Sequence, residues 1–210
     1  MAIGARPASE EPQEDPGRAP FVLSDEDAML RVQRTGDHRA FGLIMRQWER
    51  RIRRLCTRMT GDQHRAEELA QEAFMRLYER ADAYRHGARV STFLWRVAVN
   101  LCLDELRRPG RRTVALPEED GPGAGQVPPA PTPTPAAAAS ERERAERVRD
   151  ALAHLPDHYR AVVVLRHYEG LKFRQVAEVL DIPEGTVKSR MAEALDRLAV
   201  LLGPLAPEGA

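Results

Sequence analysis

Apolar residues recur every three or four positions along much of this chain, which is the spacing of amphipathic helices. One such stretch has its apolar positions at Phe41, Ile44, Trp48, Ile52, Leu55 and Met59, and Gly61 is placed to end it. The next stretch has them at Ala66, Leu69, Ala70, Ala73, Phe74 and Leu77. A third, at 92–108, is apolar nearly all round, and its polar exceptions form one narrow stripe of Arg96, Asn100, Asp104 and Arg107. The sequence therefore predicts an all-α fold.

The periodic pattern is interrupted by segments of different composition. Residues 1–21 are rich in Pro, Glu and Ala, and we expect them to form a disordered tail. Residues 109–139 are rich in Pro, Gly and Ala, which is typical of a flexible, extended linker. The sequence thus predicts two small helical domains joined by a Pro/Ala-rich linker, at 22–108 and 140–203, with a short tail at 204–210.

The C-terminal domain ends with a pattern typical of DNA-binding proteins. We expect the domain to begin at Ser140, because Ser140 and Glu143 have the spacing of a capping box. Near its end, a short and a longer helical stretch flank the break Asp181-Ile182-Pro183, with Asp181 predicted to cap the longer one. This is the helix-turn-helix pattern, whose second helix enters the major groove of DNA. An ordinary helical hairpin with a solvated face remains the alternative.

The composition narrows the classes of function. The 210 residues have a formal net charge of zero, so any contact with nucleic acid must come from local patches. The sequence shows no Ser/His/Asp, Cys/His, phosphate-loop or metal-ligand arrangement, and it predicts no catalytic residues, cofactor, metal or small-molecule substrate. Cys56 and Cys102 are expected to be buried hydrophobes in a reduced compartment. Since no apolar run has membrane-spanning length and no signal peptide is evident, we expect a cytoplasmic protein without membrane insertion.

Several blocks in order resemble the small extracytoplasmic-function (ECF) sigma factors of the sigma-70 family, which direct bacterial RNA polymerase to promoters. The blocks are RVQRTGDHRAF (Arg31–Phe41), HRAEELAQEAFMRLYERADAYR (His64–Arg85), STFLWRVAVNLCLDELRR (Ser91–Arg108), LPDHYRAVVVLRHYEGLKFRQVAEVL (Leu155–Leu180) and GTVKSR (Gly185–Arg190). The resemblance covers both predicted domains and places the linker where the family usually has it. It implies core RNA polymerase, promoter DNA and an anti-sigma factor as partners.

The first domain would carry two of the implied surfaces. An acidic and polar helix face would bind polymerase through Glu67, Glu68, Gln71 and Glu72, although a solvated charged face would show the same pattern. The block 91–108 resembles the helix that captures the melted −10 element, in which flipped bases are read by hydrogen bonds. Asn100 would read a base there, and Arg96, Arg107 and Arg108 would hold phosphates. Tyr84, in the preceding loop, would either stack on a base or anchor its loop in the core.

The helix-turn-helix would read the −35 element as duplex. The residues implied are Arg174, Thr186, Lys188, Ser189, Arg190 and Glu193. Where the family usually has an aromatic residue or His followed by Arg, this chain has Ala192 and Glu193. Fewer cations weaken binding to phosphates, but a glutamate can accept a hydrogen bond from cytosine N4. We therefore expect a divergent −35 preference, with Arg174 restoring one phosphate contact.

The resemblance leaves other interpretations open. The arginine-rich stretch 46–58 could track DNA or polymerase, but we favour a merely solvating role for most of its arginines. The chain could also be a free-standing helix-turn-helix regulator that binds duplex DNA without polymerase. A further alternative is a decoy that binds polymerase or an anti-sigma factor but melts no promoter.

Overall fold

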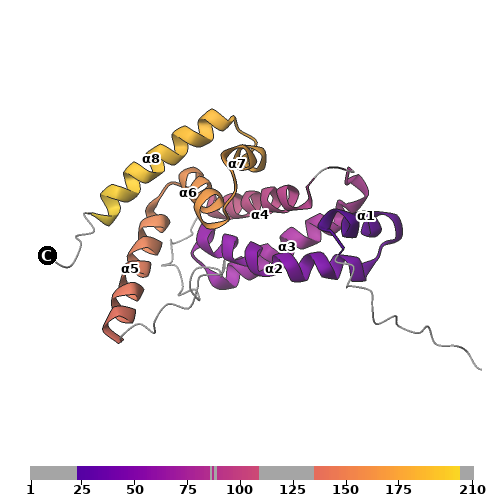
Figure 1. Ribbon diagram of the computed structural model, residues 1–210, viewed down its shortest axis with the longest axis horizontal. Helices are drawn as coiled ribbons and strands as arrows, with labels where there is room; N and C mark the ends of the chain where they lie inside the picture. The colour runs from indigo at the N-terminus through magenta and orange to yellow at the C-terminus, as the bar shows by residue number, and fades with distance from the viewer. Residues whose placement is uncertain (1–22, 86, 88, 109–134, 204–210) are drawn as a thin grey trace, which may run out of the picture.

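The structure is a computed structural model, and the residues that it describes are 23–85, 87, 89–108 and 135–203. All regular structure in these residues is helical, which confirms the predicted all-α class (Figure 1). The predicted tails and most of the predicted linker lie outside the described residues. The predicted domain boundaries therefore stay predictions, except where a described helix crosses one.

The first domain is a helical bundle centred on α2. Its elements are α1 (Asp25–Thr35), α2 (His38–Thr60), α3 (Gln63–Glu79), the short 3-10 helix η1 (Ala81–Ala83) and α4 (Val90–Leu106). Helix α2 packs against α1, α3 and α4. The apolar stripes predicted for α2 and α3 are buried, apart from the half-buried Phe41. The helical periodicity in the sequence therefore located the core of this domain.

Local sequence signals set the helix ends of this domain. Ser24, Asp37 and Asp62 each accept a hydrogen bond from a backbone N–H in the first turn of the next helix. Gly36 and Gly61 end α1 and α2 in the left-handed conformation, with φ of 64° and 75°. The expectation that Gly61 ends its helix is thus confirmed.

The second domain begins earlier than the sequence predicted. Its elements are α5 (Pro135–His154), α6 (Asp157–Val163), the π-helical turn η2 (Val164–Tyr168), α7 (Phe173–Leu180) and α8 (Glu184–Leu202). Ser140 therefore lies inside α5, and its predicted role as the cap that begins the helix is wrong. Because alanine has the highest helix propensity and proline is tolerated in a first turn, the Pro-Ala run before Ser140 can be helical.

The turn of the helix-turn-helix also differs from expectation at one residue. Asp181 ends α7 in the left-handed conformation, with φ of 55°, and its N–H donates to the carbonyl of Ala177. The N-terminal cap position of α8 is Pro183 and not Asp181. Short polar side chains tolerate the left-handed region, so the predicted start signal of α8 is in fact the stop signal of α7.

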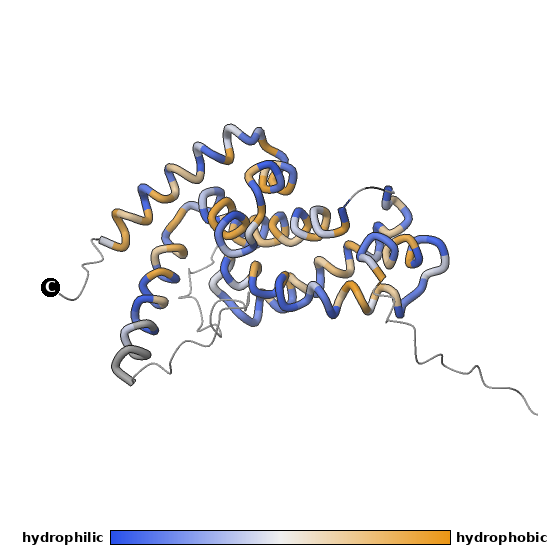
Figure 2. The backbone as a smooth tube through the Cα atoms, in the orientation of Figure 1, coloured by the Kyte–Doolittle hydropathy of each residue, from blue (hydrophilic) through white to orange (hydrophobic). Residues whose placement is uncertain are grey.

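A single apolar core runs through both domains. Buried residues of α6, η2, α7 and α8 belong to the same cluster as those of α1 to α4. A smaller cluster, Leu152, Leu155, Val163 and Ala194, holds α5 and α8 together. Figure 2 shows hydrophobic residues running through α4 and through the segments of α6 and α7 beside it. The second domain therefore packs directly on α2 and α4 of the first.

Arg160 of α6 lies at the boundary between the domains, and only 4% of its surface is exposed. Its guanidinium donates hydrogen bonds to the backbone carbonyls of Met59, Leu152, Ala153 and Leu155, at 2.5 to 3.0 Å. These carbonyls belong to the C-terminal ends of α2 and α5, where helices lack internal donors. Burial lowers the pKa of Arg160, and Asp157, 3.8 Å away, partly offsets this. One side chain thus satisfies two helix ends.

Replacing Arg160 with leucine should lower the free energy of unfolding by about 3 kcal/mol, because buried carbonyls lose their donors. Arg160→Lys should recover only part of the loss, since an ammonium lacks the forked donors of a guanidinium. Urea denaturation followed by circular dichroism measures both. Arg147→Leu, at an exposed position of α5, is the control. A loss for Arg160→Leu no larger than that of the control would contradict the capping role.

Candidate nucleic-acid interface

The exposed side of α4 carries the predicted −10 residues. Arg96, Asn100, Asp104 and Arg107 are all exposed, whereas Leu94, Trp95, Val97, Ala98, Leu101 and Cys102 of the same helix are buried. We call these four exposed residues the α4 polar stripe. Their spacing of three or four residues places them on one face of the helix. The structure therefore brings Arg96, Asn100 and Arg107 together as the sequence analysis expected.

The arginines at this site already have partners within the protein. Arg96 donates to the backbone carbonyl of Glu178 in α7. Arg107 pairs with Asp104 at 3.3 Å, and Arg108 pairs with Glu105 at 3.1 Å. The amide of Asn100, by contrast, has no hydrogen bond to any residue that the structure describes. Asn100 is thus the member of the stripe whose donor and acceptor are both available to a base.

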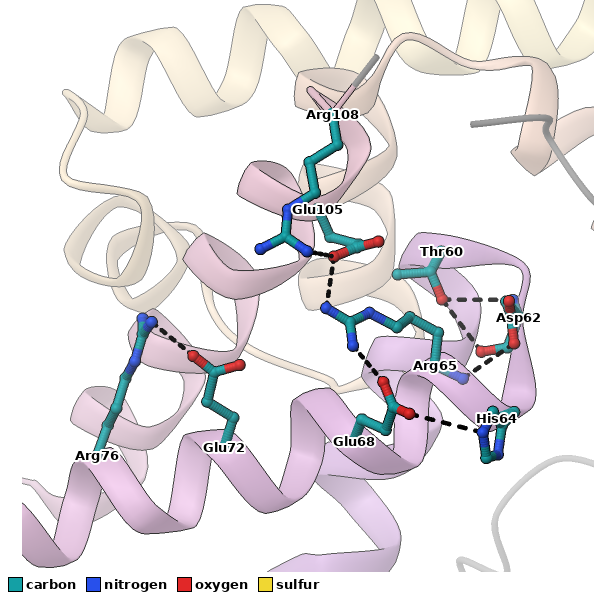
Figure 3. A network of polar contacts seen from close by, with 9 residues as sticks. All are labelled: Thr60, Asp62, His64, Arg65, Glu68, Glu72, Arg76, Glu105 and Arg108. Carbon is teal, nitrogen blue, oxygen red and sulfur yellow. Dashed lines mark hydrogen bonds and ion pairs between the residues drawn. The ribbon is translucent and has the colours of Figure 1, made fainter. Parts of the chain in front are cut away.

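A polar network links α4 to the predicted polymerase-binding helix (Figure 3). Arg65 of α3 donates to Glu68 on the same helix and to Glu105 of α4, the latter at 2.7 Å. These hydrogen bonds raise the pKa of Arg65. The side chain of Glu105 is 10% exposed and also accepts from Arg108. Sequence reasoning missed Arg65 and Glu105, because their separation along the chain gives no local signal.

The predicted polymerase-binding residues lie on α3. The ionic partners of their carboxylates come from α2 and from α3 itself. Glu67 pairs with Arg53 at 3.3 Å, and Glu72 pairs with Arg76 at 2.7 Å. The acids of this set are 43% to 47% exposed, so such pairs contribute little and can exchange partners. Gln71 is exposed.

An exposed methionine extends this surface. Met75 is 62% exposed. It follows Gln71 by four residues and Glu72 by three, so all three share one side of α3. The sequence analysis assigned Met75 no role, although its helical spacing from the acids could have indicated one. The face is therefore both acidic and partly apolar, a combination that suits a protein partner.

Tyr84 has the packing of a loop anchor. Its ring is partly buried against the first-domain core, and its backbone carbonyl accepts a hydrogen bond from Gln33 at 2.9 Å. Burial raises the pKa of its phenol, and the carboxylates of Glu26, Asp25 and Asp27 raise it further. Such an acidic neighbourhood repels phosphates. These contacts favour the anchoring interpretation, and stacking on a base stays a prediction. His86 and Ala88 of the same loop lie outside the described residues.

The predicted −35 residues lie on α7 and the first turns of α8. Lys188 pairs with Glu184 at 2.7 Å, and Arg174 pairs with Glu178 at 3.3 Å. The hydroxyl of Ser189 donates to the carbonyl of Thr186 at 3.0 Å. Each of these contacts is exposed and joins two residues of the same helix, either α7 or α8. A DNA phosphate could therefore replace the present partner of Arg174 or Lys188 at small cost.

Arg190 and Glu193 lie on the flank of α8 that faces the rest of the protein. Arg190 lines a cleft of about 570 Å³ together with Asn100 and Arg107 of α4 and His158 of α6. Burial lowers the pKa of His158, and the charge of Arg190 lowers it further. Glu193 lies at a separate groove between α8 and the α5–α6 corner, and it pairs with Arg197 at 2.8 Å. Residues predicted to read two different DNA elements therefore share one cleft.

The arginine-rich stretch of α2 divides into residues with different partners. Arg51 and Arg58 approach the carboxylate of Glu169, at 3.6 and 3.5 Å, from across the domain boundary. The Arg58 guanidinium also lies 4.4 Å from the ring centre of Tyr168. Arg51 and Arg58 therefore do more than solvate the helix, whereas the solvating role expected for most arginines of the stretch stays a prediction. Sequence reasoning missed this contact because Glu169 belongs to the other domain.

Within the described residues, both cysteines are buried and neither forms a disulfide. That part of the chain also holds no group of three or more His, Cys, Asp or Glu side chains that could bind a metal ion. None of its helices has the length and apolar character needed to cross a membrane.

Comparison with protein families identifies both domains. The Sigma-70 region 2 family matches residues 44–112, and the Sigma-70 region 4 family matches residues 145–198. The first match contains α4 and its polar stripe, and the second contains the helix-turn-helix. The two helical domains thus match the two Sigma-70 regions in the order in which they occur along the chain.

Individual relatives agree with this. The chain is 34% identical to the ECF RNA polymerase sigma factor SigW of Bacillus subtilis, over 80% of this chain and 92% of the relative. It is 34% identical to the ECF RNA polymerase sigma factor SigM of Mycobacterium tuberculosis, over 84% of each. The chain therefore belongs to the ECF RNA polymerase sigma factors, a family of transcription initiation factors.

Solved structures of similar fold include CnrH in complex with the cytosolic domain of CnrY. The TM-score is 0.62 at 20% identity, with 85% of this chain and 96% of that chain covered. Another is the sigma factor RpoE of Bartonella quintana in complex with the anti-sigma factor NepR. Its TM-score is 0.60 at 18% identity, with 77% and 96% covered. At these identities the likeness shows the two-domain helical fold.

Proposed function

We propose that this chain binds core RNA polymerase and directs it to promoters by dividing promoter recognition between its domains. Helix α3 binds polymerase, α4 captures the melted −10 element, and α7 with α8 reads the −35 element as duplex. The observation that carries this proposal is the α4 polar stripe. Helix α4 buries most of its other residues, and its exposed stripe carries an amide and two arginines, which are groups that can contact bases and phosphates.

The chemistry of the stripe suits single-stranded DNA. The amide of Asn100 offers a donor and an acceptor, which is what the edge of an unpaired base requires. Arg96, Arg107 and Arg108 would exchange their present partners for phosphates, which position the strand without reading its sequence. On this proposal the chain binds and selects DNA and catalyses no reaction itself.

An anti-sigma factor is the other partner that we propose. Two solved structures of similar fold contain a partner protein, namely the cytosolic domain of CnrY in one and the anti-sigma factor NepR in the other. Since this chain shares their two-domain fold, a comparable inhibitor would act by covering the polymerase-binding and DNA-binding surfaces. Such a protein would work in the cytoplasm, where the chromosome is.

Run-off transcription with core polymerase and a pool of genomic fragments tests the proposed function. We expect discrete transcripts that depend on this chain. Stable polymerase binding without any promoter-dependent transcript would favour the decoy. Binding to duplex DNA without polymerase association would favour the free-standing regulator.

Replacing Asn100 with alanine should change the base preferred in the −10 element, because the side chain that forms the base-edge hydrogen bonds is removed. The loss of one such contact corresponds to about 1–3 kcal/mol of discrimination. Sequencing of transcripts from a promoter library randomised at the −10 element measures the preference, and polymerase affinity should change little. An unchanged preference would remove Asn100 from the reading role.

Charge reversal on α3 should weaken polymerase binding. Glu68→Lys combined with Glu72→Lys places cations where the proposal requires acids, and we expect a loss of affinity of roughly tenfold or more, equal to about 1.4 kcal/mol. Fluorescence anisotropy with core polymerase measures it. Glu79→Lys, at an exposed position near the end of the same helix, is the matched control. Equal affinities for the two variants would place the polymerase contact elsewhere.

Glu193→Arg should strengthen non-specific binding of this chain to duplex DNA and steepen its salt dependence. The substitution removes an anion and adds a cation, so the slope of log K against log salt should become more negative by about 1. Titration of random duplex DNA at several salt concentrations measures the slope. If the slope does not change, residue 193 faces away from DNA, toward the α5–α6 corner that it contacts here.

A further inference from the structure

The cleft that contains Arg190 is large enough for a small organic ligand. Helix α4 packs against α6 and α7, and both of these pack against α8 (Figure 1). The cleft lies where the four helices meet, and each of them or its cap contributes to the lining. Its volume of about 570 Å³ is in the range of pockets that hold small ligands in proteins.

Arg190 is the residue of this cleft that points to an anion. It is partly buried and has no hydrogen bond or ion pair to any residue that the structure describes. The other cations of α8, Lys188 and Arg197, each pair with an acid four residues away. The residues four positions from Arg190 are Thr186 and Ala194, which carry no charge. A partly buried cation without a countercharge is available to an anionic ligand.

The polar lining around Arg190 is positive on balance. Arg107 lines the cleft as well, and its present ion pair is exposed and can be exchanged. The imidazole of His158 feels the charge of Arg190, which lowers its pKa in addition to the effect of burial. The acid of the lining, Asp157, lies 3.8 Å from the buried guanidinium of Arg160. Two arginines therefore face one carboxylate that already has a countercharge.

The rest of the lining suits a flat organic ring. Leu103, Pro156, Ala161 and Leu180 supply apolar surface from α4, α6 and α7. Asn100 adds an amide that has no hydrogen bond to any described residue. An amide offers a donor and an acceptor at once, which matches the edge of a nucleobase. The cleft thus combines cations for an anionic group with an apolar and amide lining for a base.

We propose that this cleft binds a free nucleoside di- or triphosphate, with its phosphates at Arg190 and Arg107 and its base near Asn100. The cleft holds the nucleotide and does not change it, so no reaction is involved. This inference goes beyond the proposed function and does not rest on it. One chain provides the whole lining, and binding can be measured without DNA or polymerase.

Isothermal titration of the full-length chain with ATP and with GTP, without magnesium, tests the proposal. Salt at about 0.15 M screens charges that lie more than roughly 8 Å apart, so a diffuse attraction contributes little. We expect saturable binding of at least one nucleotide at a single site. Pyrophosphate and the matching nucleoside should each bind at least roughly tenfold more weakly, because each makes only part of the contacts. Absence of binding by both nucleotides would overturn the proposal.

Variants locate the binding in the cleft. Arg190→Gln should weaken nucleotide binding roughly tenfold or more, because a charge-assisted contact with phosphate is lost. Asn100→Ala should also weaken it. Arg147→Gln removes the same charge from an exposed position of α5 and should bind as the parent chain does. Circular dichroism and thermal melting without nucleotide check that each variant is folded. Equal affinities for Arg190→Gln and Arg147→Gln would overturn the site.

Two further outcomes separate this inference from the DNA contacts proposed above. Binding of a single-stranded DNA 6-mer without any binding of free nucleotides would assign the cleft to the DNA strand and overturn the nucleotide site. Run-off transcription decides the proposed function independently. Nucleotide binding by a chain that gives no promoter-dependent transcript would reject the proposed function and support the site.

Discussion

The buried guanidinium of Arg160 is the interaction on which the arrangement of the two domains depends. A helix ends with carbonyl groups that have no internal donor, and burying such groups without partners is unfavourable. Arg160 supplies donors to the ends of α2 and α5 together, so these helices can end side by side inside protein. The apolar residues that follow Arg160 in α6 then pack into a core shared by both domains. The second domain has only a small cluster of its own, and this explains why it rests on the first.

Much of this fold could be predicted from the sequence because its signals are local. Helical periodicity located the core of the first domain, and Gly61 marked the end of α2. The errors arose where one local signal has two meanings. Ser140 and Glu143 have capping-box spacing, yet the Pro-Ala run before them is helical as well. Asp181 can begin a helix or end one, and only its left-handed backbone shows that it ends α7.

The candidate site was predictable one surface at a time. Family resemblance pointed to α3, to α4 and to the helix-turn-helix separately, and it could not show that the last two face each other. The pairs Arg65–Glu105 and Arg58–Glu169 join residues far apart in the chain, and neither has a periodic or local signal in the sequence. The arginine-rich stretch, which looks uniform in the sequence, is divided by the fold between Glu67 and Glu169.

Exposure divides the charged residues of this protein into two groups with different roles. Exposed pairs such as Lys188–Glu184 and Glu72–Arg76 contribute little to stability, so DNA or polymerase can take over one partner of each at small cost. The buried carboxylate of Glu169 is different, because burial outweighs its countercharges and keeps its pKa raised. A well-packed apolar contact at that position would often be more stable than such an ion pair. The boundary between the two domains therefore combines an apolar core that both share with a buried carboxylate whose countercharges only partly offset its burial.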